Sequence, residues 1–170
     1  MRDGDFDLKA LYAALDQQRQ ARGMTWAAAA RDISAAGPVP ARRPVASSTI
    51  TSLRTKALAE ADGVLQMLGW LGRAPESFVP GLPPALAAST LPTVDARAVL
   101  RFDTRKLYEA LAVARDACGF TWSETAAATG VPASHMRGLA SGGRTAFPLV
   151  MRLTRWLQEP ASRFVRQSPY

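Results

Sequence analysis

Apolar residues recur at helical spacing near the start of the chain and again in its second half. The first set is Leu8, Leu11, Tyr12 and Leu15, and the second is Leu107, Tyr108 and Leu111. Each set lies on one face of a helix with about 3.6 residues per turn. Asp7 and Asp103 precede the two sets as N-caps would, and Gly23 and Gly119 follow where a left-handed residue would end a helix. The pattern therefore predicts one amphipathic helix in each half.

These two helices open a longer internal repeat. Residues 6–26 match residues 102–122 at a constant offset of 96, and residues 65–79 match residues 151–165 at an offset of 86. The first copy thus carries ten extra residues. The simplest organisation is two similar small domains. We place them at 1–79 and 102–170, with an inserted arm at 37–46 and a Pro-rich linker at 80–101.

Further helices are predicted in each copy. The second helix runs from the Thr-Trp pair to about Ile33 in copy one and to about Thr129 in copy two. The later spans are 62–72 in copy one, and 133–141 and 147–158 in copy two. No strand-like alternation of useful length stands out. The predicted fold is all-α, with two tandem domains of about five helices each.

The second and third helices of copy two are predicted to form a helix-turn-helix, because a tight turn containing Gly130 joins them. Val131, Met136 and Leu139 are expected to face inward and to hold the third helix. The outward positions are then Ala133, Ser134, His135, Arg137 and Gly138. Most of these side chains are short, which would let the helix enter a DNA major groove.

The segment TWSETAAATGVPASHMRGLASGGRTAFPLVMRLTRWL, residues 121–157, resembles the helix-turn-helix domain of the phage-repressor (Cro/C1, or XRE) family. That family combines Thr or Ser, an acidic residue and Ala on the second helix, then a Gly-Val turn, a polar recognition helix and a final amphipathic helix. The resemblance covers nearly all of 102–165 and, more weakly, 6–79. It implies two tandem lambda-repressor-like DNA-binding domains.

The resemblance also implies a set of DNA contacts. The positions that read bases in the family correspond to Ser47, Ser48, Thr51 and Ser52 in copy one and to Ala133, Ser134, Arg137 and Gly138 in copy two. The positions that anchor phosphates correspond to Thr25 and Thr121. The basic loop after the recognition helix corresponds to Lys56 and Arg144. Thr49, Arg54 and His135, on or beside the same helices, complete the predicted set.

Two arginines of the first helices, Arg19 and Arg115, pair in many family members with an acid just after the recognition helix. Arg54 and Ala140 occupy that place in this chain. We therefore expect Arg19 and Arg115 to find another acid or a phosphate.

The inserted arm brackets Arg42 and Arg43 between prolines. Proline fixes φ and removes a backbone donor, so the arm is predicted to be extended. Paired arginines there could follow the DNA backbone or enter a narrow minor groove.

Charge favours a polyanionic partner. The chain has 170 residues, a formal net charge of +7 and a pI near 10.5. One cysteine, an acidic start and the lack of an apolar run long enough to span a bilayer favour a cytoplasmic, nucleoid-associated protein. No nucleophile–base arrangement, metal cluster or Gly-rich phosphate loop stands out, so we expect no enzyme activity, metal or cofactor.

These observations predict a sequence-specific double-stranded DNA-binding transcriptional regulator, with a repressor as the default and a homodimer possible. A protein-interaction adaptor or antitoxin-like partner binder is an alternative, because the linker LPPALAASTLPTV at 82–94 is apolar and expected to be exposed. A non-specific architectural DNA-binding protein is a second alternative.

Overall fold

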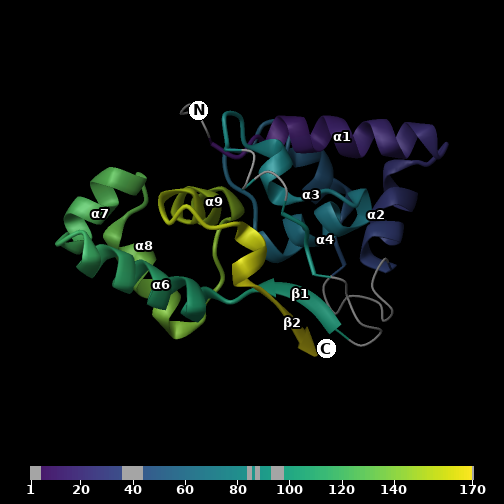
Figure 1. Ribbon diagram of the computed structural model, residues 1–170. Helices are drawn as coiled ribbons and strands as arrows, with labels where there is room; N and C mark the ends of the chain where they lie inside the picture. Colours follow the sequence, from purple (N-terminus) through teal and green to yellow (C-terminus); the bar gives the residue numbers. More distant parts are fainter. Residues whose placement is uncertain (1–4, 36–43, 84–85, 87–88, 93–97, 170) are drawn as a thin grey trace.

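The described residues of the first half form four helices and a short turn (Figure 1). The computed structural model describes residues 5–35, 44–83, 86, 89–92 and 98–169. The first-half elements are α1 (Leu8–Ala21), α2 (Trp26–Ala35), α3 (Ser47–Ser52), α4 (Ala61–Leu71) and the 3-10 turn η1 (Pro75–Phe78).

The second half repeats this order between two short strands. Its elements are β1 (Ala98–Phe102), α6 (Thr104–Ala117), α7 (Trp122–Thr129), α8 (Ala133–Gly138), the 3-10 turn η2 (Leu139–Ser141), α9 (Phe147–Trp156), the 3-10 turn η3 (Ala161–Phe164) and β2 (Val165–Pro169). The described chain is therefore mostly helical, as its sequence predicts.

Equivalent residues of the repeat make equivalent contacts. The backbone N–H of Asp7 donates to the carbonyl of Phe78 at 2.8 Å, and that of Asp103 donates to Phe164 at 2.7 Å. The side chains of Asp7 and Asp103 both accept backbone hydrogen bonds from the first turns of α1 and α6, as predicted for N-caps. Gly23 and Gly119 have φ of 61° and 67°, the left-handed conformation expected after the helix ends.

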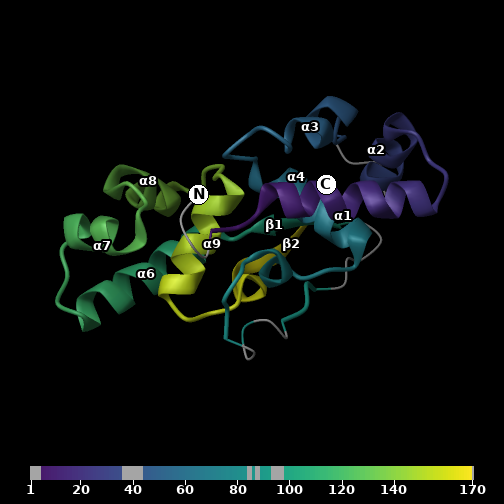
Figure 2. The ribbon, with the colours of Figure 1, turned by 90° about the horizontal axis from the view of Figure 1, so that it is seen from above.

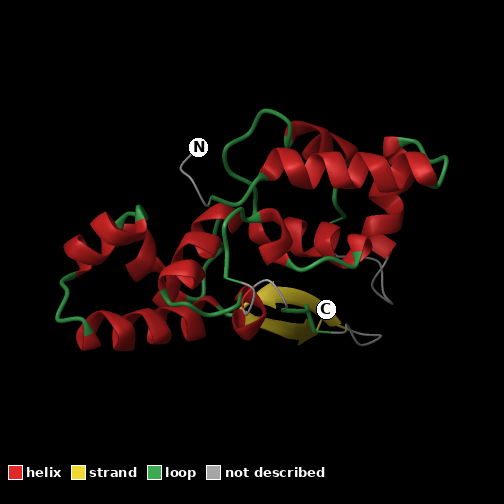
Figure 3. Ribbon diagram, turned by 45° about the horizontal axis from the view of Figure 1, so that its top comes forward, coloured by secondary structure: helices red, strands yellow, loops and turns green. Residues whose placement is uncertain are grey.

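The all-α prediction missed a two-stranded antiparallel sheet (Figure 3). In it, β1 pairs with β2 in the register Ala98↔Pro169 to Phe102↔Val165. Residues 98–101, which we assigned to the linker, therefore lie in a strand. Each strand is five residues long and its partner is distant in sequence, so local alternation carries too little signal to reveal the pairing.

The buried apolar residues of both halves form one cluster. Phe147, at the start of α9, lies at the point where the halves meet. Its ring centroid is 4.6 Å from that of Phe6 and 5.4 Å from that of Phe102, two equivalent residues of the repeat. Burial of this cluster removes apolar surface from water and holds the halves together.

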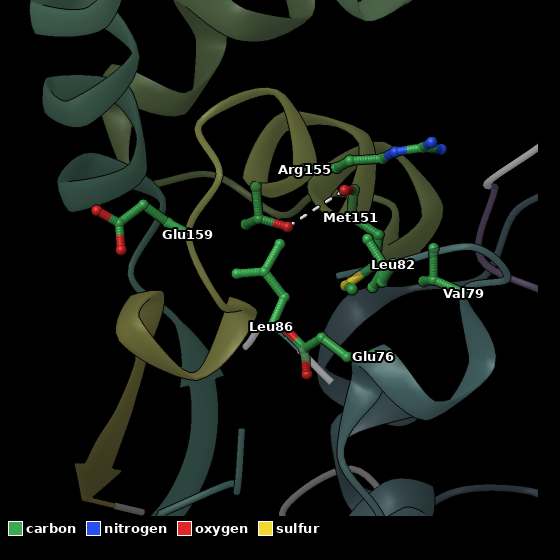
Figure 4. Close-up of a pocket in the computed structure, with 8 residues that line it drawn as sticks. Glu76, Val79, Leu82, Leu86, Met151, Arg155 and Glu159 are labelled. Atoms are coloured by element: carbon green, nitrogen blue, oxygen red, sulfur yellow. Dashed lines mark hydrogen bonds between the residues drawn. The ribbon is translucent and has the colours of Figure 1, made fainter. Parts of the chain in front are cut away.

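The described leucines of the linker pack against the protein, which corrects the expected exposed apolar surface. Leu86 is 8% exposed, and Leu82 and Leu91 are half-buried against the core. In Figure 4, Leu82 and Leu86 lie near Met151 of α9 in a small hollow between the halves. Much of the apolar surface of these side chains is therefore buried within the chain, which leaves less of it for a partner protein.

A buried carboxylate ties the linker to both halves. Glu76, in η1, accepts a hydrogen bond from the hydroxyl of Ser89 at 2.5 Å and another from the backbone N–H of Ala161 at 2.7 Å. Because a buried carboxylate without donors would be costly, these bonds favour this packing of linker and η3.

Within the described ranges, no helix combines the length and apolar character needed to cross a bilayer.

Candidate nucleic-acid interface

The start of α7 is fixed by a reciprocal cap. Thr121 Oγ1 accepts from the backbone N–H of Glu124, and a Glu124 carboxylate oxygen accepts from the backbone N–H of Thr121 at 2.7 Å and from its hydroxyl at 2.8 Å. Both bonds lower the pKa of Glu124, and the bond from the backbone N–H has the larger effect. Thr25 caps α2 more simply, accepting from the N–H of Ala28 at 3.2 Å. Both threonines thus begin the second helix of their copy, as predicted.

The turn after α7 has the predicted backbone. Gly130 has φ 68°, in the left-handed region that suits glycine best. The hydroxyl of Thr129 accepts from the N–H of Val131 at 3.2 Å and donates to the carbonyl of Thr125 at 2.8 Å. The chain is therefore held by local hydrogen bonds on both sides of the turn.

Inward packing holds α8. Val131, Met136 and Leu139 are 1%, 0% and 2% exposed, so all three predicted inward residues are buried. A helix of six residues has little intrinsic stability. Its position therefore depends on these side chains and on the capped turn before it.

The opposite side of α8 is exposed and carries one long donor. Ser134, Arg137 and Gly138 are exposed. Arg137 makes one weak bond, from Nε to the carbonyl of Ala133 at 3.4 Å, and no described carboxylate forms an ion pair with it. Its guanidinium can therefore present donors to a ligand outside the protein.

Two residues assigned to the outward face of α8 lie elsewhere. His135 is half-buried, and its Nε2 is 3.0 Å from the hydroxyl of Thr145, which precedes α9. Burial lowers the pKa of His135. Ala133 is half-buried against the core. Because α8 packs against both α7 and the segment before α9, fewer of its side chains are exposed than the sequence predicted.

The corresponding face of α3 carries short hydroxyl side chains. Ser48 and Thr49 are exposed, whereas Ser47, Thr51 and Ser52 are half-buried. The hydroxyl of Thr51 donates to the carbonyl of Ser48, and that of Ser52 to the carbonyl of Thr49. Ser48 and Thr49 are therefore the residues of α3 best placed to meet a ligand.

The basic residues predicted after each third helix are on the surface. Arg54, Lys56 and Arg144 are exposed. The guanidinium carbon of Arg54 lies 5.8 Å from the ring centroid of Tyr12. Arg42 and Arg43 of the predicted arm lie outside the described residues. Val45, just before α3, is buried and donates its N–H to the hydroxyl of Ser34 at 2.9 Å.

Arg19 and Arg115 find acids within their own helices, as expected. Arg19 pairs with Asp16 at 2.6 Å, and Arg115 pairs with Asp116. Each guanidinium also lies over a tryptophan, with Arg19 4.8 Å from Trp26 and Arg115 4.5 Å from Trp122. Each guanidinium therefore contacts the tryptophan that begins the second helix and a carboxylate of its own helix, so its charge is used within the protein.

One contact that sequence reasoning missed joins the turn after α7 to the other half. Arg152 on α9 donates from Nε and Nη2 to the carboxylate of Asp5, both at 2.8 Å, and from Nη1 to the carbonyl of Gly130 at 3.1 Å. The hydrogen bonds from Arg152 to Asp5 raise the pKa of the arginine above its ordinary value. The two charges are far apart in sequence, and no motif could have linked them.

The chain matches no known protein family, no curated protein and no solved structure.

Proposed function

We propose that this protein is a sequence-specific double-stranded DNA-binding transcriptional regulator that uses two helix-turn-helix units. The observation that carries the proposal is the unit α7–turn–α8. Buried side chains hold the short α8 from one side, while Ser134, Arg137 and Gly138 remain exposed on the other. A short, externally supported helix with a polar exposed face is the element that major-groove readers present to base edges.

Charge supports the same proposal. The net charge of +7 favours a polyanion, and Arg54, Lys56 and Arg144 are exposed close after the two third helices. Phosphate contacts from such residues would supply most of the affinity. The side chains of α3 and α8 would supply the sequence preference.

We propose repression as the sign of regulation. The bound chain would act chiefly by excluding other proteins from its site, and no catalytic step is needed for that effect. An adaptor function is less favoured, because the described leucines of the linker pack on the core of this chain.

Selection from a pool of random duplexes tests the proposal. We expect enrichment of a defined site and, in anisotropy titrations, a fall of log K with log salt at a slope of about −5 to −9, as neutralisation of roughly six to ten phosphates requires. Equal affinity for selected and random duplexes would instead favour an architectural protein. A slope near zero would refute DNA binding, and co-purification of a protein without DNA protection would favour the adaptor.

A pair of charge-matched variants makes the test specific to α8. Arg137→Ala removes a cation from the proposed reading face, and Arg105→Ala removes one from the exposed side of α6. We expect Arg137→Ala to weaken binding to the selected site about tenfold, the order expected for one bidentate base contact, and Arg105→Ala to weaken it much less. Equal losses would show that only net charge matters.

A further inference from the structure

The two halves meet through equivalent residues. The backbone N–H of Ala61 donates to the carbonyl of Thr145 at 3.1 Å, and that of Phe147 donates to the carbonyl of Ala59 at 2.8 Å. At the offset of 86 found in the sequence, Ala61 is equivalent to Phe147 and Ala59 to Thr145. Each bond is therefore the image of the other, as in the interface of a two-fold dimer. The antiparallel bridge between Glu60 and Ala146 lies at the centre of this pair.

The segments that lead into the two halves also each contact the opposite half, through residues about one turn apart on the equivalent helices α4 and α9. Asp5, before α1, reaches α9 of the other half through Arg152. Arg101 is the equivalent of Asp5 at the offset of 96, and it approaches Asp62 on α4 of the other half, with Nε 3.9 Å from a carboxylate oxygen. A repeat related by simple translation would not produce this exchange.

The arrangement of helices agrees with a two-fold relation. In Figure 1, α1 and α6 lie at opposite corners of the molecule, α2 and α7 at opposite ends, and α4 and α9 between them. In Figure 2, α3 and α8 both lie toward the upper side of the view. This arrangement agrees with the two-fold relation that the exchanged backbone bonds indicate, and it leaves the third helices of the two halves on one side.

We propose that a single chain binds two inverted, unequal half-sites on one face of a DNA duplex, with α3 at one half-site and α8 at the other. This inference rests on the proposed function. Units related by a two-fold axis match the local two-fold symmetry of duplex DNA and hence an inverted repeat, whereas units related by translation would match a direct repeat. The half-sites differ because α3 presents Ser48 and Thr49 while α8 presents Arg137.

The shared core fixes the spacing of the half-sites. Because the halves are joined by one apolar cluster and by the exchanged backbone bonds, they cannot rotate independently around the duplex. Moving one half-site by about half a helical turn, roughly 5 base pairs, places it on the far side of the DNA.

The experiment starts from the site selected by the full chain. Its halves are rebuilt in three duplexes: the inverted pair, the inverted pair with about 5 base pairs added between the halves, and a direct repeat of the same halves. We expect one chain per inverted duplex by sedimentation equilibrium, and binding to the other two duplexes that is weaker by about tenfold or more, since each loses the contacts of one half-site.

Two sets of substitutions assign the halves. Arg137→Ala is expected to relax sequence preference in one half-site only, and the double substitution Ser48→Ala with Thr49→Ala in the other half-site only. Three outcomes would overturn this inference and leave DNA binding intact. They are selection of a single undivided site, equal binding to the direct repeat, and two chains per inverted site. Failure of the full chain to retain any duplex would overturn the proposed function together with it.

Discussion

At the residue scale, Arg137 is the side chain on α8 with the greatest reach. A guanidinium can bond O6 and N7 of one guanine together, which is worth about 1–3 kcal/mol of discrimination. We expect Arg137→Ala to relax preference at one base pair of the selected site, measured by competition with single-base variants of that site. A uniform loss over all variants would mean that Arg137 contacts a phosphate.

His135 makes the fold sensitive to mild acid. Burial lowers the pKa of this residue in the folded protein, so on acidification the unfolded chain takes up the proton first. The stability contributed by neutral His135 is present above about pH 6.5 and is lost as the pH falls toward the lowered folded pKa. His135 is the one histidine in the sequence, so a variant that replaces it separates the titration of the imidazole from that of the carboxyl groups.

The measurement for His135 is urea unfolding at pH 7.5 and pH 5.5. We expect the free energy of unfolding of the wild type to fall between these values, and that of His135→Gln to change less, because glutamine can still bond Thr145 and does not titrate. The same pH dependence in both proteins would contradict the assignment.

At the scale of the element, the reciprocal cap formed by Thr121 and Glu124 decides where α7 begins. Thr121→Ala removes the acceptor for the N–H of Glu124 and the hydroxyl bonded to its carboxylate, and we expect it to destabilise the protein by about 1 kcal/mol. Thr121→Ser keeps the hydroxyl and is the matched control. Denaturant midpoints of the two variants test this, and equal losses would indicate that the threonine methyl group matters more than the cap.

At the scale of the whole molecule, the Asp5–Arg152 pair connects the first half to the turn before α8. Arg152→Met withdraws two hydrogen bonds from a carboxylate that is 11% exposed, and we expect a loss of about 1–3 kcal/mol. A double-mutant cycle with Asp5→Asn, followed by urea unfolding, isolates the pair. We expect a coupling of about 1–2 kcal/mol; additive single losses would show that the two residues act separately.

The local features of this fold could be predicted from the sequence. Asp7 and Asp103 cap their helices, Gly130 turns the chain, and Met136 and Leu139 face inward, all as expected. Each of these outcomes depends on side chains within a turn or two of the same segment, through helical periodicity, capping bonds and allowed dihedral angles. The sequence by itself therefore determined the mostly helical character, the ends of several helices, the turn at Gly130 and the repeat.

Contacts between distant segments were decided by the tertiary structure alone. The pairing of β1 with β2, the turn of His135 toward Thr145 and the packing of the linker leucines depend on surfaces that exist only once the halves have met. The two-fold relation of the halves is the largest such outcome. A repeated sequence indicates that two units are alike, but it does not give their relative orientation. That orientation is fixed by the interface between the units, here by the exchanged backbone bonds of Ala61 and Phe147.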